Sequence, residues 1–366
     1  MCGSPAFISR AFYSAFDSYR EYNWFFGTER SILSAITLSI LDQSYTPSFD
    51  EAPQALQQTL EMAQHCESLG FHRFWVSEHH AFHALAGSAP EILIAALGAA
   101  TSTIRLGSGG IMLPHYSAYK VAETFSLLAN LYPDRIDLGL GRAPGAEMST
   151  AVALAADGKP NFHRFPDQVD QLLDYLNNPN AKPLVSPKPP ANLPVWMLGS
   201  SADSATLAAR LGLPYNLGLF INPSAVPSFV EHYRRSFQQG SFLEKPYAML
   251  TVSVFCAEDE AQAKLLQHTS DVNFFLYITG QAHHYAEPGK VLNPEQAEKV
   301  PVSAALQGFI DQRNQTRAVG TPEQVAAQLK QLAQQYQVDE LMLVSNMFYF
   351  GDRKRCFKLI KHIMSI

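Results

Sequence analysis

IRLGSGGIMLPHYSAYKVAETFSLLANLYPDRIDLGL, residues 104–140, contains a β-rich run, a helical pattern and a second β-rich run. In its central part, Val121, Phe125 and Leu128 recur at helical spacing. A strand, a helix and a strand in this order predict two parallel strands that are joined by a crossover helix. The stretch therefore predicts a parallel α/β fold.

The same alternation continues from residue 34 to the end of the chain. It supplies eight candidate strands, at residues 35–41, 73–76, 104–107, 136–140, 194–198, 215–220, 249–255 and 340–345. Nearly all of them are followed by a helical segment, so parallel pairing is expected. Eight such units close into a (β/α)8 TIM barrel with a packed interior. An open, doubly wound sheet is the alternative architecture.

Two connections are much longer than the others, at residues 143–193 and 257–339. The first contains a helical pattern near residues 165–176. The second contains at least two helices and a loop at residues 283–300, and the helix before the last strand begins at a capping box, Thr321–Gln324. Long segments after barrel strands usually lie over the active-site end of the barrel. We therefore expect insertions after strands 4 and 7.

The composition excludes several classes of protein. The chain has 366 residues, of which 47% are apolar and 16% charged, and a formal charge of −6. It contains no clustered basic face for nucleic acid and no apolar run long enough to span a membrane. Its four cysteines lie far apart, which excludes a disulfide scaffold and a cysteine zinc site. This cysteine usage favours the reducing cytoplasm.

Residues 1–33 differ from the rest of the chain. They are rich in aromatic residues, and Arg10 is the only charged residue before Asp17. The segment lacks the clear features of a secretory signal, and an organelle-targeting role is a weaker alternative. We expect a poorly ordered N-terminal extension at residues 1–33 and a barrel domain at residues 34–366.

Candidate catalytic residues directly follow the second predicted strand, at Glu78-His79-His80. A histidine at the carboxyl end of a barrel strand can exchange protons near neutral pH. A metal site is less favoured, because consecutive residues in an extended chain point to opposite sides. We interpret one histidine of this group as an active-site residue, with a structural histidine as the alternative.

Three further motifs end predicted strands. Gly107-Ser108-Gly109-Gly110 indicates either a flat ligand close to the main chain or an ordinary glycine-rich turn. Arg142 follows the fourth strand and can bind a phosphate or form a surface ion pair. The stretch from Leu198 to Ser204 enters a helix, where serine hydroxyls and free N–H groups bind an anion or simply cap the helix. Neighbouring strand ends would bring Arg142 and this turn together.

Over residues 34–345, these motifs follow one another in the order that is typical of the bacterial luciferase-like flavin monooxygenases. The chain therefore resembles this family. The stretch from Ser88 to Gly145 is most similar to the single-chain, alkanal-monooxygenase-like members. The motifs that carry the resemblance are Glu78-His79-His80, Gly107–Gly110 with Met112-Leu113-Pro114, Leu138–Arg142, Leu198–Ser201 and Val319–Gln324.

The resemblance implies a TIM barrel that binds reduced FMN at its C-terminal mouth. Oxygen would form a C4a-peroxyflavin that oxidises a small organic substrate, such as an aldehyde or a related aliphatic compound. His79 would assist this chemistry. The phosphate would be held by Arg142 and by the turn that contains Gly199, Ser200, Ser201 and Ser204. Gly109 and Gly110 would lie under the isoalloxazine, joined by a cis peptide bond.

The resemblance also implies partners. A separate reductase would supply the reduced FMN, because the chain has no nicotinamide-binding fingerprint, and the family suggests a homodimer. The stretch 268–300, which includes Gln281–His284, is a candidate lid that would exclude water. Luciferases have a cysteine where this chain has Gly141, which argues against light emission. The alternatives are a deazaflavin-dependent oxidoreductase, a non-catalytic flavin-binding partner subunit and a metal-dependent hydrolase.

Overall fold

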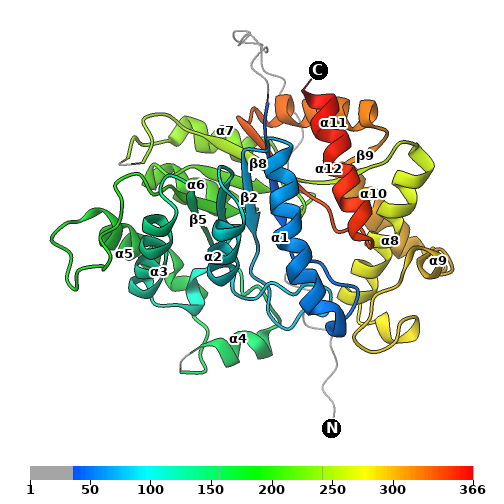
Figure 1. The fold of residues 1–366 in the computed structure, drawn as a ribbon, viewed down its shortest axis with the longest axis horizontal. Coiled ribbons are helices and arrows are strands. Elements are labelled where there is room, and N and C mark those ends of the chain that lie inside the picture. Colours follow the sequence, from blue (N-terminus) through cyan, green and yellow to red (C-terminus); the bar gives the residue numbers. More distant parts are fainter. Residues whose placement is uncertain (1–35, 156, 241, 366) are drawn as a thin grey trace, which may run out of the picture. The chain divides into compact units, whose positions relative to one another are not determined.

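Eight parallel strands close into a barrel in this computed structural model, which describes residues 36–155, 157–240 and 242–365. Around the barrel the order is β10-β1-β2-β3-β5-β6-β7-β8, and β8 pairs with β10 to close it. The predicted (β/α)8 barrel is confirmed (Figure 1). The strands are β1 Thr37–Asp42, β2 Arg73–Val76, β3 Arg105–Ser108, β5 Ile136–Gly141, β6 Val195–Gly199, β7 Tyr215–Gly218, β8 Ala248–Cys256 and β10 Glu340–Val344.

Two short strands were not anticipated. β4, Ile111–Met112, pairs with β5, and β9, Ala318–Gly320, pairs with β8. Segments of two or three residues are too short to show a periodic pattern, so no sequence signal predicts them. The expected extension at residues 1–33 lies outside the described residues.

Helices follow the barrel strands and pack outside them (Figure 1). They are α1 Ala52–Ser68, α2 Pro90–Ala100, α3 Ala118–Leu131, α6 Ala202–Leu211, α7 Ser228–Ser236, α11 Pro322–Tyr336 and α12 Phe350–Met364. Pro53 lies in the first turn of α1, and Gly70 follows its end with a φ of +75°. The predicted capping box of α11 is confirmed, since Thr321 and Gln324 satisfy each other's backbone N–H groups.

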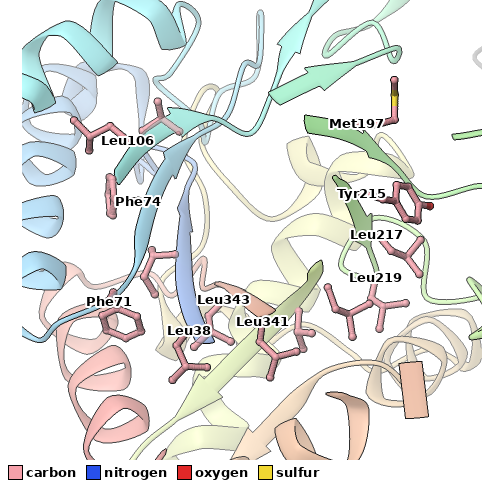
Figure 2. Close-up of a cluster of buried hydrophobic side chains, with 14 of the residues drawn as sticks. Leu38, Phe71, Phe74, Leu106, Met197, Tyr215, Leu217, Leu219, Leu341 and Leu343 are labelled. Atoms are coloured by element: carbon pink, nitrogen blue, oxygen red, sulfur yellow. The ribbon is translucent and has the colours of Figure 1, made fainter. Parts of the chain in front are cut away.

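Alternate strand residues pack outward against these helices. Leu38, Phe74 and Leu106 come from three neighbouring strands and belong to one large apolar cluster (Figure 2). On each strand, the residues that alternate with these outward-facing ones point into the barrel interior, as expected for a β-strand. A separate interior cluster contains Leu41, Trp75, Trp196, Met249, Met342 and Val344.

The amino-terminal end of the barrel interior is closed by a buried ionic network. Arg73 Nη1 lies 2.7 Å from Asp137 Oδ2, and Arg73 Nε lies 3.0 Å from Glu340 Oε1. Arg105 Nη2 contacts the other oxygen of Asp137 at 2.6 Å. Each carboxylate therefore has a cationic partner in a region that excludes water. The network lies at the end of the barrel that usually serves stability.

The two expected insertions are confirmed. After β5 the chain forms α4 Met148–Leu154 and α5 Phe165–Asn177. After β8 it forms α8 Glu260–Ile278, α9 Pro294–Ala297 and α10 Ala304–Asn314, which share a small core of their own around Leu276 and Leu306. Short 3-10 turns occur at Phe49–Glu51, Leu113–His115, Phe162–Arg164 and Ala282–His284. None of the described helices is both long and apolar enough to cross a membrane.

Candidate active site

The carboxyl ends of parallel strands meet at one end of a barrel, and the motifs singled out above follow these ends. Residues 77–80 follow β2, and the Gly109–Gly110 pair follows β3. Arg142 follows β5, and Gly199 ends β6. The structure therefore places the sequence-predicted site residues at one mouth.

Glu78 is the buried anchor of the β2 end. Its carboxylate accepts hydrogen bonds from His80 Nε2 at 2.8 Å, from the Tyr116 hydroxyl at 2.9 Å and from the Met112 backbone N–H at 2.9 Å. Burial, together with the adjacent Glu78, raises the pKa of Tyr116, so the phenol remains a donor. Glu78 thereby ties β2 to β4 and to the turn after it. The sequence placed Glu78 in the candidate catalytic group but did not predict this anchoring role.

His79 points to other partners than His80 does. Its Nδ1 lies 3.0 Å from Ser77 Oγ, and no described residue hydrogen-bonds to its Nε2. Burial lowers the pKa of His79 to about 4, so the ring is neutral near pH 7. The two histidines therefore do not form a pair of metal ligands. Within the described part of the chain, no group of three or more His, Cys, Asp or Glu side chains is arranged to hold a metal.

The Gly109–Gly110 bond is cis, as the resemblance implied. A Cβ atom on Gly109 would lie 2.6 Å from Leu41 Cδ1. On Gly110 it would lie 2.5 Å from Leu198 Cδ1 and 2.7 Å from the Gly139 carbonyl oxygen. Only glycine fits at Gly110, where the neighbour is backbone, whereas a side chain at Gly109 would require Leu41 to shift. The two glycines form a backbone floor bordered by two leucines. Such a floor suits a flat ring system.

Arg142 and the start of α6 converge at the mouth. Arg142 Nη1 lies 3.9 Å from Oδ2 of Asp203 in the first turn of α6. Ser201 is the N-cap of this helix, and its hydroxyl makes no capping hydrogen bond. Backbone N–H groups at a helix N-terminus and a nearby arginine together suit a phosphate. The expected convergence of Arg142 with this turn is therefore present.

Ser204 has a different place from Ser200 and Ser201. Its Oγ donates a hydrogen bond to the Ser201 carbonyl at 2.7 Å and lies 3.2 Å from the Tyr215 hydroxyl. A Cβ atom on Gly199 would lie 2.2 Å from the same Oγ, so glycine leaves the room that Ser204 occupies. Ser204 thus supports the turn from within.

The candidate lid reaches the loops beside the mouth. Tyr277 of α8 packs on Phe82 with ring centroids 4.2 Å apart, and the Phe82 ring lies 6.3 Å from that of His79. Farther along, the Val291 N–H donates to the Pro47 carbonyl at 3.0 Å. The insertion after β8 therefore contacts the loops that follow β1 and β2, close to the histidine.

Comparison with known proteins assigns the family. Residues 36–340 match the family model of luciferase-like monooxygenases. The chain belongs to this family. It is 42% identical to the uncharacterized protein YwcH of Bacillus subtilis over 336 residues, which cover 89% of this chain and 98% of that protein. It is 34% identical to N-acetyl-S-alkylcysteine monooxygenase of Bacillus subtilis over 344 residues, covering 89% and 97%.

Solved structures of luciferase-like proteins share the barrel. The crystal structure of apo-MsnO8 superposes with a TM-score of 0.83 at 36% identity, covering 90% of this chain and 98% of that chain. Two more distant structures show the fold alone. The oxygenating constituent of 3,6-diketocamphane monooxygenase from Pseudomonas putida, in complex with FMN, has a TM-score of 0.67 at 19% identity and covers 90% and 98%. An F420-dependent secondary alcohol dehydrogenase has a TM-score of 0.65 at 16% identity and covers 90% and 99%.

Proposed function

We propose that this member of the family is an FMN-dependent monooxygenase. It would use reduced FMN and O2 to insert one oxygen atom into a small organic substrate, such as an aldehyde or a related aliphatic compound. The observation that carries the proposal is the meeting of Arg142 with the start of α6, at the mouth that also holds His79 and the Gly109–Gly110 floor. A phosphate site, a flat floor and a proton-exchanging group are what an FMN enzyme needs from its protein.

Arg142 would hold the FMN phosphate as a bidentate donor, together with the hydroxyls of Ser200 and Ser201 and the first N–H groups of α6. Gly199 leaves room for Ser204, which fixes the Ser201 carbonyl from below. Ser204 would therefore lie near the phosphate and would hold in place the turn that binds it.

The backbone at Gly109 and Gly110 would accept the isoalloxazine, with Leu41 and Leu198 at its borders. When bound, the reduced flavin supplies the electrons that activate O2. The Ser77 hydroxyl lies 3.0 Å from Nδ1 of the neutral His79 ring, and in the tautomer that donates from Nδ1 to this hydroxyl, Nε2 would accept and return a proton beside the substrate. Phe82 and Tyr277 would shield this position from water.

The proposal includes partners. A separate flavin reductase would supply reduced FMN, because the sequence has no nicotinamide-binding fingerprint. We also infer a homodimer, supported by the large exposed side chains of Ile92 on α2 and of Leu127 and Leu131 on the adjacent α3. The dispersed cysteines support a cytoplasmic location.

Oxygen consumption with reduced FMN, measured across a panel of aldehydes, sulfonates and alkanes, tests the activity. We expect one panel class to give a product that carries one atom from labelled O2. A parallel arm offers a reduced deazaflavin, as the F420-dependent neighbour uses F420. Tight deazaflavin binding without FMN binding would replace the proposal with hydride transfer. FMN binding without product formation for any class would favour the non-catalytic subunit.

A further inference from the structure

Two arginines share one buried carboxylate in the insertion after β8. Arg317 contacts both oxygens of Asp271 on α8, at 2.8 Å and 2.7 Å. Arg313, at the end of α10, has its Nε 3.3 Å from Asp271 Oδ1 but makes no hydrogen bond through that atom within the described structure. The side chains of Arg313, Arg317 and Asp271 are only 15%, 2% and 1% exposed. The cluster therefore carries a surplus positive charge in a largely desolvated place.

This surplus charge borders a cavity at the carboxyl end of the barrel. The cavity is lined by Leu219, Phe220, Pro223, Ser253, Arg313, Thr316 and Arg317. Its volume of about 10 Å³ is that of a single water site, so it admits one oxygen atom of a polar group and not a whole molecule. Two arginines, two hydroxyls and three apolar side chains line it without any carboxylate. That combination suits the anionic head of a ligand with an apolar body.

The cavity borders the interior of the barrel. Ser253 of β8 lies opposite Val344 of β10, and parallel neighbours in register share one face, so Ser253 faces the barrel interior. Val344 belongs to the interior apolar cluster, against which Phe220 packs. Leu41 and Leu198, which border the Gly109–Gly110 floor, belong to the same cluster. Apolar side chains of one cluster therefore lie between the floor and the cavity that Arg313 lines.

Arg313 is the group of this cluster that is left to bind a ligand. Arg317 donates both of its terminal N–H groups to the two oxygens of Asp271 and so positions this carboxylate. The guanidinium of Arg313 lies over the rings of Phe274 and Phe309, at 5.2 Å and 5.3 Å from their centroids. Cation–π contacts offset only part of the cost of burying a charge. A ligand carboxylate would supply the missing counter-charge.

We propose that Arg313, Thr316 and Ser253 form a subsite for the carboxylate of the substrate, whose aliphatic body would extend toward the Gly109–Gly110 floor. This proposal rests on the proposed function and narrows the substrate to an aliphatic acid. One carboxylate oxygen would enter the cavity and accept hydrogen bonds from the Arg313 guanidinium and from the hydroxyls of Ser253 and Thr316, and the other oxygen would stay at the opening.

The test measures binding of hexanoate and of the neutral hexanamide to the full-length protein by isothermal titration calorimetry. We expect hexanoate to bind at least about tenfold more tightly than hexanamide, as charge-assisted hydrogen bonds predict. Arg313→Gln should remove this preference, and the exposed Arg210→Gln should keep it. Equal binding of acid and amide to the unsubstituted protein would overturn the proposal. So would an unchanged preference in a folded Arg313→Gln protein, which would leave the arginines a purely structural role.

A second variant keeps the test valid if Arg313→Gln does not fold. Ser253→Ala removes a hydroxyl that lines the cavity and has no hydrogen-bond partner among the described residues, so folding should persist. We expect it to weaken hexanoate binding severalfold and to leave hexanamide binding unchanged; equal effects on both would contradict the subsite. Titration with reduced FMN separates the two proposals. If the unsubstituted protein does not bind reduced FMN, the proposed function is overturned. If it binds FMN but does not prefer the acid over the amide, only the subsite is overturned.

Discussion

Arg142 Nη1 lies 3.9 Å from Asp203 Oδ2, although the two side chains are 53% and 82% exposed. The Asp203 carboxylate thus occupies the mouth of the proposed phosphate site. An exposed ion pair of this kind contributes at most about 1 kcal/mol. Arg142 is therefore held near the start of α6 without being locked there, and an incoming phosphate can displace the carboxylate.

Asp203→Asn should therefore tighten the binding of reduced FMN, by up to about fivefold at low salt. The gain comes from removing a negative charge that competes with the phosphate for Arg142. It should shrink as salt screens the exposed charges. Anaerobic fluorescence titration at two ionic strengths measures it, with Asp170→Asn as the exposed control. Weaker binding by Asp203→Asn would show that this carboxylate supports the site.

The glycine floor gives a matched pair of substitutions. Gly110→Ala should cost about 1–3 kcal/mol of unfolding free energy, because its Cβ would meet the Gly139 carbonyl oxygen at 2.7 Å, where backbone cannot yield. Gly308→Ala lies in α10 with nothing within 4 Å of the added atom and should stabilise by about 0.5–1 kcal/mol. Urea unfolding checks both. A Gly110→Ala protein as stable as the unsubstituted one would remove the argument for a closely packed floor.

The acid stability of the protein should depend on His79. Burial lowers its pKa from 6.5 to about 4, so the unfolded chain binds the proton more tightly than the folded one between these values. The stability that the neutral ring contributes is present in full above pH 6.5 and is lost as the pH falls toward 4. His79→Gln should therefore flatten the fall in unfolding free energy from pH 6.5 to 4.5. The exposed His284→Gln serves as control, and parallel pH profiles for His79→Gln and the unsubstituted protein would contradict the buried neutral ring.

The inferred dimer has its own test. Ile92, Leu127 and Leu131 are 68%, 50% and 57% exposed on two adjacent helices, which is costly for large apolar side chains unless a second copy covers them. Leu127→Glu combined with Leu131→Glu should convert the dimer to a monomer in sedimentation velocity. Leu184→Glu, at an equally exposed leucine elsewhere, should not. A monomer for the unsubstituted protein would refute the inference directly.

The barrel itself could be predicted because its strands are short apolar runs with clear punctuation. Residues 73–76 and 136–140 were located almost to the residue. The ionic network at the amino-terminal end was missed, although a signal existed. Arg73, Asp137 and Glu340 are charged residues at or near the start of apolar strands, and buried charges in a barrel must pair with one another.

The candidate site was predictable in its parts and less so in its contacts. His79, Arg142 and the Ser200–Ser201 turn follow strand ends, so topology alone brought them to one mouth. The anchoring role of Glu78 depends on Tyr116 and Met112, which reach it only through the folded turn after β4. Arg313 at the end of α10 and Arg317 in the turn after it pair with Asp271 on α8, which is 42 and 46 residues earlier in the chain, and no local pattern predicts contacts of that range.

Anaerobic titration with reduced FMN tests the central claim, that the barrel mouth is built to hold this cofactor. We predict a dissociation constant in the micromolar range or below for the unsubstituted protein. Arg142→Ala should weaken binding about tenfold or more, through the loss of charge-assisted hydrogen bonds to the phosphate. The control is Arg210→Ala, at the far end of α6, where the exposed arginine pairs with Asp170 of α5; this substitution should leave the affinity for reduced FMN unchanged. Absence of binding by the unsubstituted protein, or equal affinity of the Arg142→Ala protein, would contradict the account.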